Sequence, residues 1–373
     1  MIKRLRKVKK VRDLVPDSVV EKAANLNPLA TKSDTPPPIE SVPRITNETI
    51  AEHREEVLSG ARKYIYPLQH SKHRIIMITS TIVTGAILGL LVYCLMGLYK
   101  FYQYNTFLYR ITQVVPFPIA RINHSFVNYE NYLFELRHYV HYYQTQLQRD
   151  LNGNDKQQLI LQRKQSLEAV INNAYIKILA DRNHVSVSDK EVDARINDAR
   201  NQNRLGSSNK VFADVLRDYL GWSISDFKRS LRQEILSEKV EARLDNASRG
   251  RAADALSHLK SGANFSEIAK QVSDDPITKN NGGDYGFGIT KTNPNVPPEV
   301  VDVLFKLAPG QISGVILASR LEINRPDTLE ILKVTQTDGN TVTAQHISFY
   351  LKDISTYVDS LKKKEPPRAY VKF

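Results

Sequence analysis

The chain has 373 residues, which is long enough for two domains plus extensions. It is basic, with 52 Lys and Arg against 40 Asp and Glu, and this points to an anionic neighbour such as a membrane surface. The charge is not gathered in one stripe, so nucleic acid is disfavoured as a partner. A single cysteine, Cys94, excludes an intramolecular disulfide.

Residues 1–74 read as a disordered basic tail. They are polar and charged, with Pro36, Pro37 and Pro38 in a row and no sustained apolar period. Seven Lys and Arg lie among the first twelve residues. We expect them to be solvated on the cytoplasmic side; contact with anionic lipid or nucleic acid is the alternative.

Residues 75–99 contain no charged side chain and predict one transmembrane helix. Because 74 residues precede this run, a cleaved signal peptide is disfavoured. More Lys and Arg flank its start than its end, so we expect a single-pass protein of the cell membrane, with the N-terminus cytoplasmic and the later domains extracytoplasmic. The flanking cations are Arg62, Lys63, Lys72 and Arg74 before the run, and Lys100 and Arg110 after it.

Aromatic residues crowd the end of the apolar run and predict a belt at the outer membrane interface, made of Tyr93, Tyr99, Phe101, Tyr102 and Tyr104. Gly85 and Gly89 form a GAILG pattern that permits close pairing of two such helices, so a homodimer is one alternative. We expect Cys94 to be an inert apolar residue, with lipidation as the alternative.

Residues 100–249 predict a helical module with short connections. IARINHSFV alternates enough for a short strand, and Asn128 can cap the helix that follows. Ser188 and Glu191 have the spacing of a capping box, and Ser223 begins another helix. His138 and His141 have no third ligand in view, so packing is a better explanation for them than a metal site.

Three stretches of this module resemble the N-terminal core of the chaperone SurA and of the PrsA-type foldases. Residues 120–124, ARINH, match the family's opening strand, with His124 in place of its glycine. NHVSVSDKEVDARI resembles the connector between its helices. The third stretch contributes Phe212, Leu216, Gly221 and Ser223. The resemblance implies a domain that holds unfolded polypeptides.

Residues 250–373 resemble the parvulin (PpiC) family of peptidyl-prolyl isomerases, or rotamases. The resemblance rests on FSEIAKQVSDDPITKNNGGDYGFG, on VPPEVVDVLFKLAPGQISGVI and on LEILKV. It implies an antiparallel four-stranded sheet wrapped by helices, with a small site for a substrate proline and no metal or other cofactor. The predicted fold class is therefore α+β, with one transmembrane helix, a helical module and a parvulin-like head.

The order of elements departs from that family. The polar segment LDNASRG stands where the family has its first strand, and a matching strand, VTAQHISFYL, follows LEILKV through an Asp338–Asn340 turn. In the family these two strands are antiparallel neighbours, so we predict a circularly permuted head in which they pair. AYVKF, at residues 369–373, is expected to add an edge strand.

The resemblance assigns catalytic positions to His346, Asp275 and Glu330. Glu330 stands where the family has a second histidine. The alternatives from the residues alone are a hydrogen-bonded sheet histidine for His346 and a turn residue before Pro276 for Asp275. The family's substrate-contacting positions fall on Phe305, Val300, Val296 and Tyr285. Smaller apolar walls at two of these positions would weaken the grip on proline.

The sequence therefore predicts a membrane-anchored foldase that isomerises prolyl bonds and chaperones exported polypeptides. A tethered chaperone or polypeptide-binding envelope protein without catalysis is the first alternative. A structural envelope protein that scaffolds a complex through the Pro-rich tail is the second.

Overall fold

A computed structural model describes residues 45–65, 72–151, 153, 155–201, 208–321 and 325–373. The basic N-terminus and the Pro36–Pro38 run lie outside these residues. The chain divides into two compact units, Met1–Ala86 and Ile87–Phe373, and each is described by itself.

The first unit contains helix α2, Asn47–Ile65, inside the stretch for which we expected disorder, so that expectation was wrong for these residues. Their sequence holds no proline and has glycine only at Gly60, which allows helix formation. Where its side chains are described, the helix is largely exposed.

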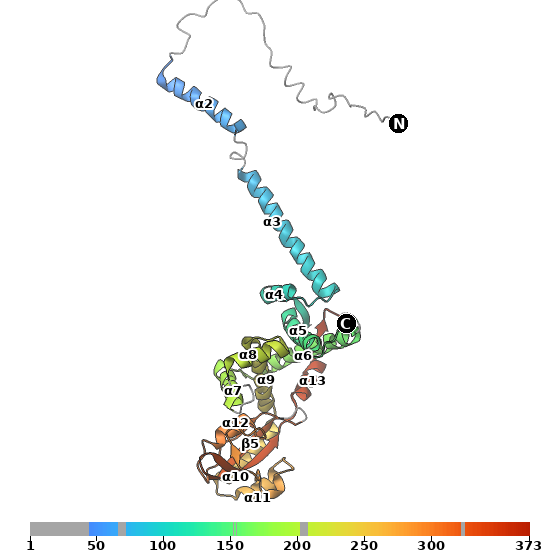
Figure 1. Cartoon of the computed structure of the whole chain (residues 1–373), viewed down its shortest axis with the longest axis vertical. Coiled ribbons are helices and arrows are strands. Elements are labelled where there is room, and N and C mark those ends of the chain that lie inside the picture. The colour runs from blue at the N-terminus through green and yellow to red at the C-terminus, as the bar shows by residue number, and fades with distance from the viewer. Residues whose placement is uncertain (1–44, 66–71, 152, 154, 202–207, 322–324) are drawn as a thin grey trace, which may run out of the picture. The chain divides into compact units, whose positions relative to one another are not determined.

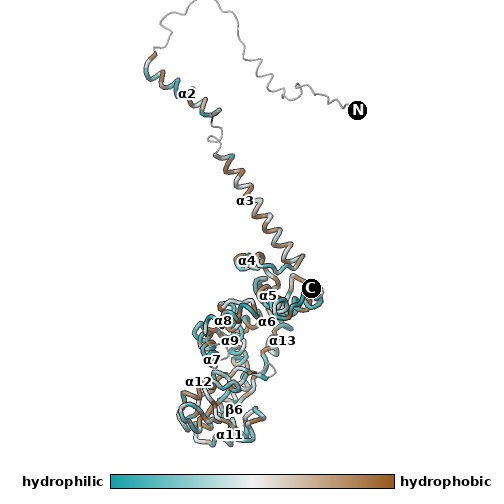
Figure 2. The backbone as a smooth tube through the Cα atoms, viewed as in Figure 1, coloured by the Kyte–Doolittle hydropathy of each residue, from teal (hydrophilic) through white to brown (hydrophobic). Residues whose placement is uncertain are grey.

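Helix α3, Lys72–Leu95, runs on from the first unit into the second and continues as a wider turn, η3, Met96–Lys100. Among the described residues, this is the one helix long and apolar enough to cross a membrane, and the most apolar window within Arg74–Lys100 has a mean hydropathy of 2.3 (Figure 2). The hydroxyl groups of Thr79 and Thr81 donate to carbonyl oxygens four residues earlier, so these polar groups are satisfied within the helix.

The second unit begins with the helical module. Its elements are α4, Thr106–Val114; β1, Pro118–Ile122; β2, Ser125–Asn128; α5, Tyr129–Thr145; α6, Lys156–Arg182; α7, Asp189–Asn201; α8, Asn209–Val215; η4, Leu216–Leu220; and α9, Ile224–Leu244 (Figure 1). Both predicted helix starts are confirmed, since Ser188 and Glu191 make their reciprocal bonds and Ser223 makes the same box with Asp226. Asn128 stands at the start of α5, but its side chain makes no capping bond.

The end of the chain returns to this module, which corrects the boundary that we expected at residues 250–373. Helix α13, Ile354–Lys364, contributes Val358 and Leu361 to the module's core. Strand β7, Arg368–Ala369, pairs with β1, so AYVKF supplies an edge strand to the module and not to the head. Burial of these apolar side chains holds the last twenty residues against the helices.

Three members of the expected aromatic belt also contact the helical module. Tyr99 donates a hydrogen bond to the carbonyl of Pro118 (2.6 Å), and the hydroxyl of Tyr102 donates to the carbonyl of Lys372 (3.1 Å). Both rings, with that of Tyr104, pack against the module's core. Tyr93 and Phe101 remain exposed.

The head follows the module. Its elements are α10, Asn246–Lys260; α11, Phe265–Val272; η5, Lys279–Asn281; β3, Ile289–Thr290; α12, Pro298–Leu304; β4, Ile316–Ala318; β5, Thr328–Thr337; and β6, Thr341–Tyr350 (Figure 1). Within the described residues, the strands of the head form one sheet in the order β3-β6-β5-β4.

Strands β5 and β6 pair antiparallel along their length, so the predicted pairing of LEILKV with VTAQHISFYL is confirmed. Their tight turn uses Gly339 at φ +89°, a conformation that favours glycine. The side chain of Asp338 accepts hydrogen bonds from the backbone of Asn340 and Thr341 and so stabilises this turn.

Side chains on a strand alternate between the two faces of the sheet. One face, with Ile331, Ile347 and Phe349, packs against α10 and α11. The other face, with Leu332 and Ala344, packs against α12. Further along this second face the side chains are polar, and these polar side chains form the candidate site.

Candidate active site

Three ionisable side chains meet at the polar end of the second sheet face. His346 and Ser348 lie two residues apart on β6 and share that face, and Glu330 of β5 stands directly opposite Ser348. Asp275 comes from the loop between α11 and η5. The exposed fraction of His346, Asp275 and Glu330 is 6% each, so the whole group is withdrawn from water.

The loop that carries Asp275 is fastened to β6 at both ends. Before it, the backbone of Asp274 donates to the carbonyl of Ser348 (2.8 Å), and the Asp274 carboxylate accepts from the backbone of Tyr350 (3.0 Å). After it, the carbonyl of Gly283 accepts from the backbone of His346 (2.8 Å). Gly283 has φ +80°, and a Cβ there would collide with the carbonyl oxygen of His346. The glycine motif therefore sets how closely the loop approaches the strand.

The two ring nitrogens of His346 both face acceptors. The Thr278 hydroxyl donates to Oδ2 of Asp275 (2.6 Å), so it is an acceptor for Nε2 of His346 at 2.9 Å. The Ser348 hydroxyl bonds to Oε1 of Glu330 (3.3 Å), so it is an acceptor for Nδ1 at 3.1 Å. Carboxylate oxygens of Asp275 and Glu330 lie 3.4 Å from Nε2 and Nδ1. A ring that donates from both nitrogens is an imidazolium.

The electrostatics agree with this assignment. Burial disfavours the charged imidazole, but attraction to Glu330 and hydrogen bonding to Asp275 outweigh burial and raise the pKa of His346 to about 9. For Asp275, burial acts to raise the pKa, and hydrogen bonds from His346 and Thr278 overcome it, so that the pKa lies well below its usual range.

Tyr285 completes the floor of the site. Its ring stacks on the imidazole of His346, with the ring centres 4.2 Å apart and the planes at 17°. Its hydroxyl lies 3.4 Å from Oε2 of Glu330. Burial, followed by the charge of Glu330, raises the pKa of Tyr285 well above its ordinary value, so the phenol stays protonated.

A pocket of about 510 Å³ opens over this floor. Asp275, Glu330, His346 and Tyr285 line it, and apolar groups join them on the walls, including Ile277 and Phe287. Ile277 and Phe287 are themselves exposed, so they are available to a bound molecule. The pocket therefore combines a charged, water-excluded floor with an apolar rim.

Three of the predicted substrate contacts are not on the pocket wall. Val296 and Val300 are fully buried in the core beneath α12, and Phe305 packs against that same core. Val300 lies on the side of α12 that packs against the sheet, and Val296 and Phe305 flank the helix and pack in the same core. Pro294, Asn295 and Pro297 of the preceding loop line the pocket instead. Glu330 and Tyr285 do lie with His346, as the resemblance implied.

Thr278 and Ser348 were missed, although they connect the three ionisable groups. Two signals were available. Thr278 follows Asp275 by three residues, the spacing at which an aspartate side chain accepts from a following backbone N–H, and Oδ2 of Asp275 does accept from the backbone of Thr278 (3.2 Å). Ser348 follows His346 by two residues on a strand, so both share a face. Within the described ranges, no cluster of three or more His, Cys, Asp or Glu could hold a metal ion.

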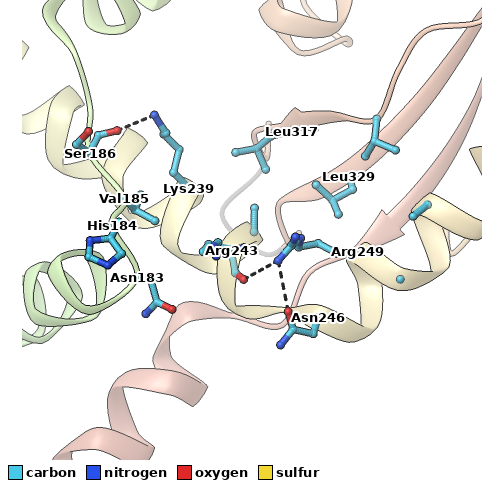
Figure 3. A pocket seen from close by; sticks show the side chains of 14 residues that line it. Asn183, His184, Val185, Ser186, Lys239, Arg243, Asn246, Arg249, Leu317 and Leu329 are labelled. Atoms are coloured by element: carbon cyan, nitrogen blue, oxygen red, sulfur yellow. Dashed lines mark hydrogen bonds between the residues drawn. The ribbon is translucent and has the colours of Figure 1, made fainter.

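A larger groove, of about 1060 Å³, lies elsewhere in the same unit, between the α6–α7 connection, α9, α10 and strands β4 and β5 (Figure 3). Its lining includes Lys239, Arg243 and Arg249 and no acidic side chain among the described residues. Leu317 and Leu329 lie on its apolar side (Figure 3). Arg249 is oriented by the carbonyl of Arg243 (3.2 Å) and by Asn246 (3.4 Å).

Family models match the helical module, together with the apolar helix before it, and the head. A SurA-like N-terminal domain matches residues 69–241, and a PPIC-type PPIASE domain matches residues 235–336. The second match ends before β6, the strand that carries His346. If the family's first strand has moved to the end of the head, a match in the family's usual order of elements would end at this position.

Curated relatives agree with the models. The chain is 25% identical over 227 residues to the "Foldase protein PrsA" of Enterococcus faecalis, covering 54% of this chain and 64% of that protein. It is 34% identical over 94 residues to "Foldase protein PrsA 2" of Bacillus cereus, covering 25% of this chain and 30% of the relative. It is 37% identical over 78 residues to the "Chaperone SurA" of Burkholderia pseudomallei, covering 21% and 15%. The chain thus spans less than two thirds of each of these proteins. The head and the module therefore combine a PPIC-type PPIase domain with a SurA-like N-terminal domain, and the chain is a homologue of the PrsA foldases and SurA chaperones.

Proposed function

We propose that the protein is a membrane-anchored extracytoplasmic foldase, which catalyses cis–trans isomerisation of prolyl bonds and chaperones exported polypeptides. The observation that carries the catalytic half is the Asp275–His346–Glu330 network, buried under a pocket with an apolar rim. The domain matches support the same activity. We propose boundaries at 1–74, 75–99, 100–249 and 250–373, with residues 354–373 reassigned to the module.

Isomerisation needs no covalent step. The barrier, about 18–20 kcal/mol, arises from the partial double-bond character of the peptide bond. A site lowers it by binding the twisted amide more tightly than the planar one. In this pocket Ile277 and Phe287 would hold the proline ring, and the floor would keep water from the amide carbonyl. The network itself stays charged and rigid, so its part is to orient the floor and fix the electric field there.

The test is a prolyl isomerisation assay on the full chain in detergent, with His346→Gln and Asp275→Asn as site variants. Glu267→Gln is the control, since it neutralises an exposed carboxylate of the head that forms an ion pair with Lys270. We expect both site variants to lose at least about tenfold in kcat/KM, which corresponds to about 1.4 kcal/mol of transition-state binding, while the control retains wild-type activity. Wild-type activity equal to buffer would overturn the catalytic half.

The second candidate is a tethered chaperone without catalysis, and the groove in Figure 3 is the observation that favours it. The apolar side of the groove and the guanidinium groups of Arg243 and Arg249 suit an unfolded segment that carries acidic and apolar residues. Suppression of client aggregation by an inactive protein, and its loss in Arg243→Glu with Arg249→Glu, would support this candidate. If the double variant still suppresses aggregation, the groove is not the site that binds the client.

A further inference from the structure

The end of the apolar helix is built into the core of the helical module. Cys94 and Leu98 are buried there, although the residues before them on the helix are exposed. The hydroxyl of Tyr129 donates to the carbonyl of Leu98 (2.6 Å), and Tyr99 donates to Pro118 (2.6 Å). The module is therefore joined to the helix by packed side chains and not by a free linker, so the helix fixes how far the module lies from the membrane.

Helix α4 packs back against this same end of the helix. Gly97 leaves room for the side chain of Leu108. A Cβ atom added at residue 97 would lie only 2.9 Å from Cδ1 of Leu108. The ring centres of Phe107 on α4 and Tyr93 on α3 are 6.0 Å apart. Tyr93 stands seven residues before Lys100, a distance of about 10 Å along a helix. Phe107 therefore lies at the level of the uncharged helix and not beyond its charged end.

The outer side of α4 is apolar and uncovered. Phe107, Arg110 and Val114 occupy one side of the helix at spacings of three and four residues. Phe107 is 54% exposed and Val114 is 83% exposed. Leu108 and Thr112, on the other side, are buried in the module. The packing of the module does not require these two large apolar side chains to face water.

Further apolar residues extend this surface on both sides of α4. Phe101 is 55% exposed, with the ammonium group of Lys100 5.8 Å from the centre of its ring, and Val115 is 42% exposed. We call Phe101, Phe107, Arg110, Val114 and Val115 the α4 surface. Aromatic and aliphatic groups beside Lys and Arg suit the boundary between lipid headgroups and acyl chains.

We propose that the α4 surface is a membrane-docking site, which lies in the headgroup–acyl boundary of the bilayer that α3 crosses. This rests on the proposed membrane anchoring. Lipid is favoured over a second copy of the chain because the surface is continuous with the exposed end of the span through the Tyr93–Phe107 contact. Docking would fix the module against the bilayer and set the distance at which the head can meet a polypeptide emerging from the membrane.

The experiment measures quenching of tryptophan fluorescence in vesicles of brominated phosphatidylcholine and phosphatidylglycerol, with full-length protein. Trp222, the single tryptophan, is first replaced by Phe, which keeps a ring against Phe134. Single tryptophans are then placed at Phe107 or Val114 on the α4 surface, at Leu88 in the span, and at Val211 on α8 as a control. All four positions are exposed, so each variant retains the core.

We expect Phe107→Trp and Val114→Trp to be quenched roughly twofold, most strongly by bromine near the headgroup end of the acyl chain, since an interfacial helix is buried only about 5–10 Å. Leu88→Trp should be quenched most by bromine deeper in the chain, and Val211→Trp should not respond. Quenching at Leu88 without quenching at Phe107 and Val114 would overturn the docking proposal and leave the anchor intact. Absence of quenching at Leu88 would overturn the anchor and the docking proposal with it.

Discussion

Replacing Glu330 by Gln tests the electrostatic account of the site directly. The change removes a charge 3.4 Å from Nδ1 of His346 and nearly conserves shape. At an effective dielectric constant of about 20, two unit charges at this distance attract by about 5 kcal/mol, which is an upper bound. Measured effects of one opposite charge on a pKa are about one to three pH units. The pKa of His346 should therefore fall from about 9 by that amount.

The measurement is an NMR titration of protein labelled with ¹³C at histidine Cε1, as full-length protein in micelles. The chain has nine histidines, and His346→Gln identifies the resonance of interest by its disappearance. Glu267→Gln is the matched control, because it neutralises an exposed carboxylate of the same domain. A His346 pKa that Glu330→Gln leaves within about 0.3 pH unit of wild type would refute the ion pairing described above.

The same substitution has a consequence for stability. A pKa raised from 6.5 to about 9 contributes about 3 kcal/mol to folding, fully present below pH 6.5 and lost as the pH rises through about 9. Because Glu330→Gln lowers the folded-state pKa of His346, the alkaline loss should begin at lower pH and be smaller. Urea unfolding at pH 6 and pH 9.5 measures how much unfolding free energy the wild type and the variant each lose between these pH values. An equal loss in the two proteins would contradict this reasoning.

Three other predictions concern the loop, the acid side and the chain end. Gly283→Ala should cost about 2 kcal/mol or more, because the new methyl group meets a backbone carbonyl, whereas Gly310→Ala, with φ +85° but open space, should cost less in urea unfolding. Because the pKa of Asp275 is lowered, its contribution is fully present above pH 3.8 and is lost as the pH falls below that value; Asp275→Asn should remove part of the fall in Tm between pH 4 and pH 2. Leu361→Ala should lower the free energy of unfolding of the module by about 2 kcal/mol, since α13 packs in the module's core. Trp222 fluorescence reports this transition. Equal effects of the two glycine variants, an unchanged acid response or an unchanged Trp222 transition would contradict the respective arguments.

Local sequence determined much of the architecture. An uncharged run of 25 residues is enough to predict the long apolar helix, because length and hydropathy are properties of the segment alone. The capping box at Ser188 and the helix start at Ser223 depend on bonds within four residues of chain. The pairing of β5 with β6 follows from a short turn between two alternating strands. These features depend on neighbours in the sequence, and they were predicted correctly.

The site and the end of the chain were decided by contacts between distant residues. His346 and Asp275 are brought together because Gly283 and Asp274 fasten one loop to β6, and the sequence does not display that register. Val296 and Val300 share a motif with the family's pocket residues, yet Val300 on α12 and Val296 in the loop before it both pack into the core. Val371 packs in the module and not in the head, because β1 has an open edge there for β7. Sequence alone thus determined which elements form, and tertiary packing decided which side chains meet, since a side chain's direction depends on the surface against which its element settles.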